Sequence, residues 1–199
     1  NQIGDGLLPP DNFGSAHLVL LPKNVGPVLP KDTRPISITN SAYRIIMKIW
    51  AEPFSRLASR HLTPNQRALL EDRFIDDCID DISNTYKGYA TKGLNPILPQ
   101  TDFQKAFDFI NRDAILHILT TVRYPQRLIN VAKIALREST SMLSIPGTKP
   151  FPINTKTGVK QGCPLSPILF IIAYDVLNHH LTSLPGIIIS RSYMDDIGI

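Results

Sequence analysis

The chain has 199 residues, of which 43% are hydrophobic and 19% are charged, and its formal net charge is +4. This composition is typical of a globular protein with a real core and excludes an intrinsically disordered one. No apolar run reaches the roughly 18 residues of a membrane span, so we expect no membrane association. Cys78 and Cys163 are far apart, which argues against a disulfide framework or a zinc site. The mild positive charge permits a polyanionic partner without requiring one.

Hydrophobic periodicity predicts five elements in the first half of the chain: a strand over residues 16–21, a short apolar run over 36–38, a helix over 41–61, a helix over 72–86 and a strand over 95–103. We expect Asn40 or Ser41 to cap the first helix and Pro53 to kink it. The second helix carries four aspartates opposite its apolar face: Asp76, Asp77, Asp80 and Asp81. We interpret them as a solvated face, with metal or substrate binding as the alternative.

The second half is expected to hold helices over residues 112–122 and 126–138, a hairpin of 142–145 with 152–157 around Pro146-Gly147, a helix over 166–181 and a final strand–turn–strand from Ile187 to Ile199. Asn111 can cap the first of these helices, and Ser166 with Pro167 can open the last one. Strands and helices in this mixed order indicate an α+β sheet domain.

Asp195 and Asp196 are adjacent at the tip of the final strand–turn–strand. Ionised carboxylates side by side repel each other unless a cation lies between them, so a divalent metal site is the first hypothesis. Asp102 closes the strand over residues 95–103, and pairing of the strands would bring it beside the other two. Three carboxylates can hold two Mg²⁺ ions about 3.5–4 Å apart, an arrangement that suits phosphoryl transfer. A helix cap or a surface position is the alternative for Asp102.

Four segments resemble the sequence blocks of reverse transcriptases and occur in the order of that family. They are R-P-I-S at residues 34–37, D-F-Q-K-A-F-D at 102–108, G-V-K-Q-G-C-P-L-S-P at 158–167 and Y-M-D-D at 193–196. The residues in these blocks are most similar to those of the reverse transcriptases of non-LTR (LINE-like) retrotransposons. The chain departs from the family in two places: the G-F-x-x-G-R stretch keeps only its final Arg73, and Tyr-Met-Asp-Asp stands where LINE-like members more often have Phe-Ala-Asp-Asp.

The resemblance implies the fingers and palm of a right-hand polymerase, an α+β fold, with the thumb absent. Residues 1–92 and 112–155 would be mainly fingers, and residues 93–111 and 156–199 mainly palm. We therefore expect a fragment of a longer protein, inactive when isolated.

The resemblance also implies a role for each matching residue. Asp102, Asp195 and Asp196 match the catalytic, metal-binding triad. The nucleotide-binding positions are Lys23, Arg34, Phe103, Lys105, Ala106, Phe107, Gln161 and Gly162. The positions near primer and template are Arg73, Tyr193 and Met194. Phe107 matches the aromatic residue that excludes a 2′-hydroxyl, and Arg34 the guanidinium that grips the triphosphate. The alternative for Lys23 and Lys105 is a solvated surface. Arg34 could instead brace the fingers turn, and Gln161 could serve only to satisfy the loop backbone.

The implied activity is RNA-directed DNA polymerisation with two Mg²⁺, or Mn²⁺ as a substitute, on an RNA template with a DNA primer and dNTP. A non-catalytic nucleic-acid-binding remnant of a decayed element is the alternative, and Phe107 opposes an RNA-dependent RNA polymerase. We expect an intracellular protein, with the nucleus and the cytoplasm both open. The sequence leaves the oligomeric state unknown.

Overall fold

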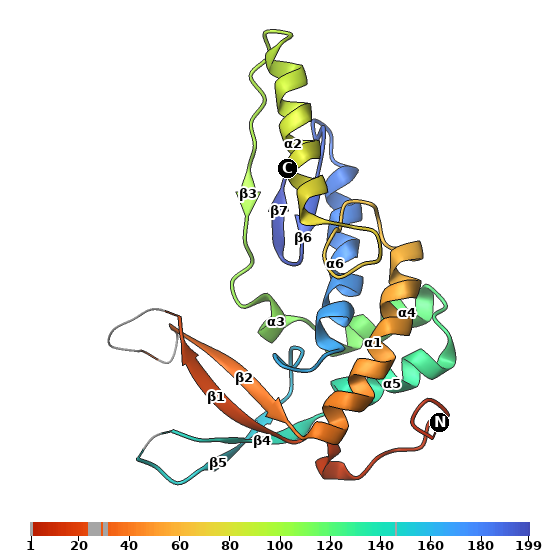
Figure 1. Cartoon of the computed structure of the whole chain (residues 1–199), viewed down its shortest axis with the longest axis vertical. Helices are drawn as coiled ribbons and strands as arrows, with labels where there is room; N and C mark the ends of the chain where they lie inside the picture. The colour runs from red at the N-terminus through yellow and green to blue at the C-terminus, as the bar shows by residue number, and fades with distance from the viewer. Residues whose placement is uncertain (1, 24–28, 30–31, 146) are drawn as a thin grey trace. The chain divides into compact units, whose positions relative to one another are not determined.

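The computed structural model describes residues 2–23, 29, 32–145 and 147–199 (Figure 1). The chain divides into two compact units, and each is described by itself below. Unit 1 consists of Asn1–Glu52 and Phe107–Ser166, and unit 2 of Pro53–Ala106 and Pro167–Ile199. Helices and strands occur in mixed order in both, which confirms the predicted α+β class. None of the helices in the described part combines the length and the apolar character that crossing a bilayer requires.

A four-stranded sheet organises unit 1, with the strand order β2-β1-β4-β5. Its strands are β1 (Ala16–Pro22), β2 (Thr33–Thr39), β4 (Ser139–Leu143) and β5 (Phe151–Thr155). β1 pairs antiparallel with β2 and parallel with β4, and β4 pairs antiparallel with β5. Figure 1 shows β1 and β2 as one hairpin and β4 and β5 as another. A short 3-10 helix, Asp11–Gly14, precedes the sheet.

Helices α4 (Arg112–Thr121) and α5 (Gln126–Leu136) belong to unit 1, and α1 (Ser41–His61) runs through both units. The predicted caps of α4 and α1 are confirmed, whereas Ser166, predicted to cap the last helix, is the first residue of that helix, α6 (Ser166–Thr182). The Asn111 side chain accepts the backbone N–H groups of Asp113 and Ala114, and the Asn40 side chain accepts that of Tyr43 at 2.7 Å. Residues that are fully buried in unit 1 are Tyr43, Met47, Ile115, Leu119, Val131 and Leu165.

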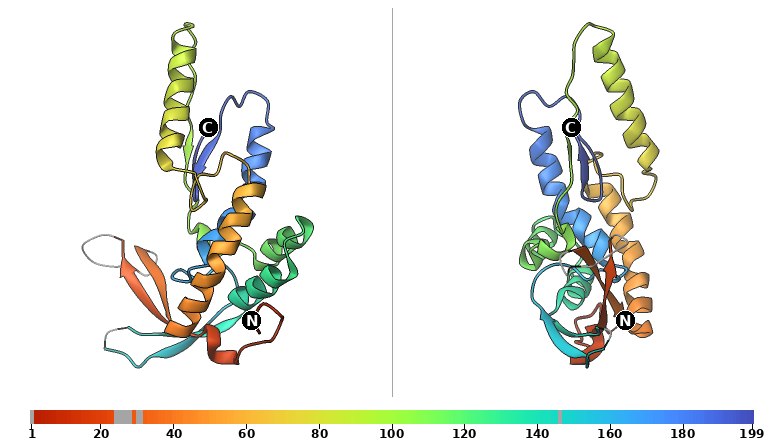
Figure 2. Two further views of the ribbon diagram at one scale, coloured as in Figure 1. Left: turned by 45° about the vertical axis from the view of Figure 1, so that its right-hand side comes forward. Right: turned by 90° about the vertical axis from the view of Figure 1, so that its left-hand side faces the viewer.

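Unit 2 holds a three-stranded antiparallel sheet with the order β3-β7-β6. The strands are β3 (Gln100–Thr101), β6 (Arg191–Tyr193) and β7 (Asp196–Gly198). Its helices are α2 (Ile75–Ala90) and most of α6 (Ser166–Thr182), and the single-turn α3 (Ala106–Phe109) lies at the unit boundary. Figure 2 shows α2 and the extended segment that contains β3 running side by side. The sequence of α6 from Ile168 to Ile172 is buried on every side, as its continuous apolar run predicts.

Several predicted bounds are corrected by the structure. The strand expected over residues 95–103 is reduced to the two residues of β3, because Pro96 and Pro99 cannot donate to a ladder. Residues 187–189 form no strand, and β6 begins at Arg191 instead. Helix α2 begins at Ile75 rather than at residue 72, because Phe74 is extended. Pro53 lies inside a continuous α1. Pro146, at the predicted hairpin turn, lies outside the described residues.

Candidate active site

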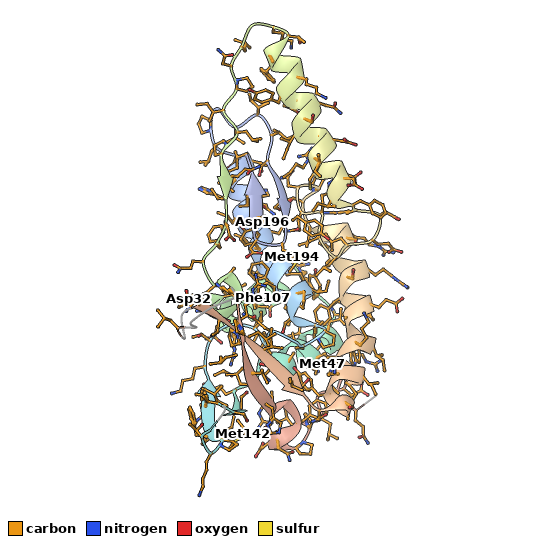
Figure 3. All side chains as sticks on the ribbon, turned by 60° about the vertical axis from the view of Figure 1, so that its left-hand side comes forward. Asp32, Met47, Phe107, Met142, Met194 and Asp196 are labelled. Carbon is orange, nitrogen blue, oxygen red and sulfur yellow. The ribbon has the colours of Figure 1, made fainter. Side chains whose placement is uncertain are left out.

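Asp195 and Asp196 lie at the tip of the hairpin that β6 and β7 form in unit 2. Figure 3 labels Met194 and Asp196 there. Tyr193 pairs with Asp196, which leaves Met194 and Asp195 as a two-residue turn. Met194 has a φ of 59°, whereas Asp195 is not among the described residues with positive φ. These are the signs of a type II′ turn, whose twist suits a β-hairpin. The tight turn therefore presents both carboxylates at one end of the sheet.

Asp102 reaches the same end of the sheet through β3. Gln100 pairs with Gly198 and Thr101 pairs with Ile197, in antiparallel register. Continuing that register by one residue places Asp102 opposite Asp196. Both aspartates also line one cavity of about 420 Å³, which apolar residues of α2 line as well. The convergence that the sequence predicts is thus explained by strand register.

The electrostatics of unit 2 agree with this convergence. Burial raises the pKa of Asp195, and the negative charges of Asp196 and Asp102 raise it further. The pKa of Tyr174 is raised by burial and then by the charges of Asp195, Asp196 and Asp102. Three carboxylates thus share one electrostatic environment.

A divalent cation suits this set of donors. Carboxylate oxygens are the hard ligands that Mg²⁺ prefers, and a cation would relieve the repulsion that raises the pKa of Asp195. In the part of the chain that the structure describes, no group of three His, Cys, Asp or Glu side chains is arranged so that it could hold a metal ion. The chemistry of the three aspartates fits a metal, and their role as ligands therefore stays a prediction.

Tyr174 supports the turn, and two phenylalanines pack against its ring. The hydroxyl of Tyr174, on α6, donates to the backbone carbonyl of Asp195 at 3.0 Å. The ring of Phe103 meets the Tyr174 ring edge-on with centroids 5.5 Å apart, and Phe170 stacks on Tyr174 at 5.3 Å. The role of Tyr174 was not predicted from the sequence. A tyrosine directly after the apolar run of residues 168–173 is the available signal, because a buried phenol needs a hydrogen-bond partner.

The aspartates of α2 correct another interpretation. Asp81 accepts hydrogen bonds from Arg191 at 2.7 Å and from Arg67 at 3.2 Å, and Arg67 also lies 3.6 Å from Asp77. The bond from Arg191 lowers the pKa of Asp81. A merely solvated face is therefore wrong for Asp77 and Asp81, which are ion-paired. Because Arg191 begins β6, the Asp81 pair ties α2 to the hairpin that carries the aspartates.

Arg73 stabilises the loop between α1 and α2. Its guanidinium donates to the backbone carbonyls of Ser59, Leu62, Thr63 and Gln66 at 2.6–3.1 Å. Burial lowers its pKa. This bonding gives Arg73 a structural role in the loop. The proposed proximity of Arg73 to primer and template stays a prediction, as it does for the half-buried Tyr193 and Met194.

In unit 1, the predicted nucleotide-binding residue Gln161 is held on two sides. Its side chain donates to Asp108 at 2.9 Å, and its backbone carbonyl accepts the N–H of Ser37, on β2, at 2.7 Å. Gly162 has a φ of +114°, and a Cβ there would lie 2.5 Å from the Ser37 carbonyl oxygen. A side chain therefore does not fit at position 162. Gln161 and Asp108 line a cavity of about 310 Å³.

The remaining predicted nucleotide-binding residues fall in both units. Arg34 is exposed on β2, and Lys23 is exposed just after β1, with its backbone N–H donating to Asp32. Phe107 is half-buried, and its carbonyl accepts the N–H of Val159 at 2.8 Å. In unit 2, Lys105 is exposed with a φ of 55°, and Ala106 is half-buried. Their roles toward a nucleotide stay predictions.

Comparison with known proteins agrees with these motifs. The family model described as reverse transcriptase (RNA-dependent DNA polymerase) matches residues 21–199. A retrovirus-related Pol polyprotein from the type-1 retrotransposable element R2 of Popillia japonica is 27% identical over 179 residues, covering 89% of this chain and 25% of that protein. An uncharacterised 149 kDa protein of transposon TX1 from Xenopus laevis is 26% identical over 191 residues, covering 92% of this chain and 15% of that protein.

Among solved structures, apo telomerase from Candida tropicalis matches with a TM-score of 0.64 and 14% identity, covering 96% of this chain and 40% of that one. At this identity the likeness shows the fold alone, and it confirms the predicted fold class. The chain spans a quarter or less of the two curated relatives. The resemblance to reverse transcriptases of non-LTR retrotransposons is confirmed.

Proposed function

Because the chain belongs to the reverse transcriptase family, whose enzymes use divalent metal ions, we propose that it forms the catalytic part of a retrotransposon RNA-directed DNA polymerase. The convergence of Asp102, Asp195 and Asp196 at one end of the sheet of unit 2 carries this proposal. In the reaction, the 3′-hydroxyl of a DNA primer loses its proton and attacks the α-phosphorus of a dNTP. A new phosphodiester bond forms, and the bond to pyrophosphate breaks.

The three carboxylates are proposed to hold two Mg²⁺ ions, with Mn²⁺ as a substitute. Bound there, such ions would supply positive charge to the attacking and leaving oxygens. The carboxylates themselves contribute a fixed donor set at a turn held by strand pairing and by Tyr174.

The nucleotide and the nucleic acids are proposed to use the other predicted residues. Arg34 and Lys23 are exposed cations suited to phosphate oxygens, and a guanidinium can bind them in a bidentate manner. Phe107 is proposed to pack under the sugar, with Gln161 and Gly162 beside it. The RNA template and the DNA primer are held through phosphates, in keeping with the net charge of +4.

Substitution of Asp195 tests the function. In the full-length protein that carries this chain, we expect Asp195→Asn to lower primer extension on an RNA template by several orders of magnitude. The matched control is Asp80→Asn, which changes an exposed aspartate of α2 in the same unit and should leave extension unchanged. Parental extension by a folded Asp195→Asn variant would contradict the proposal. Template binding without any extension by the parent would instead identify a non-catalytic remnant.

The choice of sugar has its own test. A packed aromatic ring cannot easily retreat from a 2′-hydroxyl. We therefore expect Phe107→Val to raise incorporation of ribonucleotides markedly while use of dNTP falls only modestly. Competition between rNTP and dNTP in primer extension measures the ratio. If the variant rejects ribonucleotides as well as the parent does, Phe107 serves packing alone.

A further inference from the structure

Gln66 is a fully buried amide that the roles proposed so far do not use. Its Nε2 donates to the backbone carbonyl of Met194 at 3.1 Å, and its Oε1 accepts the backbone N–H of Met194 at 3.1 Å. The same Oε1 accepts the N–H of Ala68 at 3.0 Å. One side chain thus bonds both polar groups of a residue 128 positions away along the chain.

Met194 is the residue that needs this support. Its φ of 59° lies in the left-handed region, which glycine adopts freely and other residues adopt at a cost. A type II′ turn normally has glycine at this first central position. Met194 directly precedes Asp195 and lies in the same turn, so a change in its backbone would move both carboxylates.

The segment around Gln66 is itself firmly attached to the hairpin. The backbone N–H of Ser192 donates to Asn65 at 2.9 Å, and the N–H of Arg67 donates to Ser192 at 3.0 Å, so that Gln66 forms an isolated parallel bridge with Ser192. The guanidinium of Arg73 bonds the Gln66 carbonyl at 2.8 Å. The Gln66 backbone is therefore attached to β6, and its side chain bonds Met194.

We propose that Gln66 is a positioning residue of the catalytic turn: its amide holds Met194 in the left-handed conformation and so sets the placement of Asp195 and Asp196. This inference rests on the proposed function for its effect on activity. Its structural part, the attachment of Met194, is measurable without activity. Gln66 touches no substrate and acts through the backbone of the turn.

The main variant is Gln66→Met, which keeps the length of the side chain and removes the amide. Misplacement of reacting groups by about 1 Å can cost about 10²-fold in rate. We expect Gln66→Met to lower kcat for primer extension by about that factor, with little change in the KM for dNTP. The control is Ile171→Val or Ile171→Ala, whichever lowers Tm by the same amount as Gln66→Met. Ile171 suits this purpose because it is fully buried in α6 of the same unit. The control should leave kcat close to that of the parent.

A double-mutant cycle with Met194→Gly separates positioning from folding. Glycine adopts the left-handed conformation without help, so the turn should depend less on Gln66 in that background. Met194→Gly itself is expected to reduce activity, because it loosens the turn. The cost of Gln66→Met should fall from about 10²-fold in the parent to less than about 10-fold in the Met194→Gly background. Equal costs in both backgrounds would overturn the proposal.

Hydrogen exchange of the 199-residue chain gives a readout that does not depend on activity. Gln66→Met should lose protection at the Met194 amide by a larger factor than at amides of β6, whereas the Ile171 control should lower protection uniformly. Unchanged relative protection at Met194 would sink the inference even if polymerase activity is found. Loss of protection in this chain, together with no primer extension by the full-length protein that carries it, would support the attachment and contradict the proposed function instead.

Discussion

Lys160 is a buried ammonium group whose removal should stabilise the protein. Its Nζ has no hydrogen-bond partner among the described residues and lies 5.5 Å from the centroid of the Tyr43 ring. Burial lowers the pKa of Lys160 to about 8; the Cys163 thiol opposes this shift, and the charge of Arg112 adds to it. The lysine directly precedes Gln161, so the loop that carries the predicted nucleotide-binding residues holds a poorly compensated charge.

The magnitude follows from the pKa. A fall from 10.5 to about 8 corresponds to about 3 kcal/mol of destabilisation at pH 7, at about 1.4 kcal/mol per unit. Attraction to the Tyr43 ring offsets about 0.5–2 kcal/mol of this. We therefore expect Lys160→Met, which keeps the aliphatic length, to raise the free energy of unfolding at pH 7 by about 1–3 kcal/mol.

The pH dependence gives the sharper test. Between pH 8 and 10.5 the unfolded chain keeps the proton that the folded chain releases, so Lys160 makes stability rise with pH in this window. Burial raises the pKa of Cys78 and of Tyr43, and these groups make stability fall at higher pH. The parent and Lys160→Met both contain Cys78 and Tyr43, so the difference between their free energies of unfolding reports the contribution of Lys160 alone.

Urea unfolding from pH 6.5 to 10 measures this difference. The advantage of Lys160→Met should be largest below pH 8 and should shrink toward pH 10. An advantage that does not change with pH, or a destabilised variant, would refute the argument that a buried charge is the cause.

Three further changes test the local geometry. Gly162→Ala should lower the free energy of unfolding by about 2–4 kcal/mol, because the new Cβ would lie 2.5 Å from the Ser37 carbonyl oxygen. In the control, Gly88→Ala, the new Cβ on α2 would meet no atom within 4 Å, and the free energy of unfolding should rise by up to about 1 kcal/mol. Asp72→Gly should raise Tm by about 1–4 °C, since Asp72 has a φ of 57°; a lower Tm would contradict this. Arg112→Lys should lower the free energy of unfolding in urea by about 2 kcal/mol or more, because the guanidinium donates to the carbonyls of Gly158, Thr155 and Thr157 at 2.7–3.0 Å. The control is Arg127→Lys. Arg127 is largely exposed, so this change should alter the free energy of unfolding by less than about 0.5 kcal/mol.

Features encoded by neighbouring residues could be predicted from the sequence. The Asn111 and Asn40 caps depend on side chains that reach backbone groups two or three residues away, and both are found. The order of the four motifs identified the family, because each motif is a short local pattern. The roles that the motifs give to the three aspartates stay predictions. Periodicity also identified the buried α6.

Features that depend on distant residues could not be predicted. The amide of Gln66 and the phenol of Tyr174 acquire their roles from partners brought close by the fold. Asp81 looks like a solvated residue until Arg191 is placed beside it. Short strands were misplaced for a related reason: the apolar residues 187–189 satisfy a strand pattern, yet they do not pair in the observed sheet.

The left-handed residues of unit 2 show how the distant contacts and the motifs fit together. Leu69, Asp72, Lys105 and Met194 have φ values of 55–59° without being glycine. Each such residue costs about 1–2 kcal/mol, and each hydrogen bond contributes about 0.5–1.5 kcal/mol in return. Gln66 bonds both polar groups of Met194, and the Ser55 hydroxyl bonds the Leu69 carbonyl at 2.8 Å. In unit 2, hydrogen bonds from side chains such as Gln66 therefore help to hold residues other than glycine in the left-handed conformation.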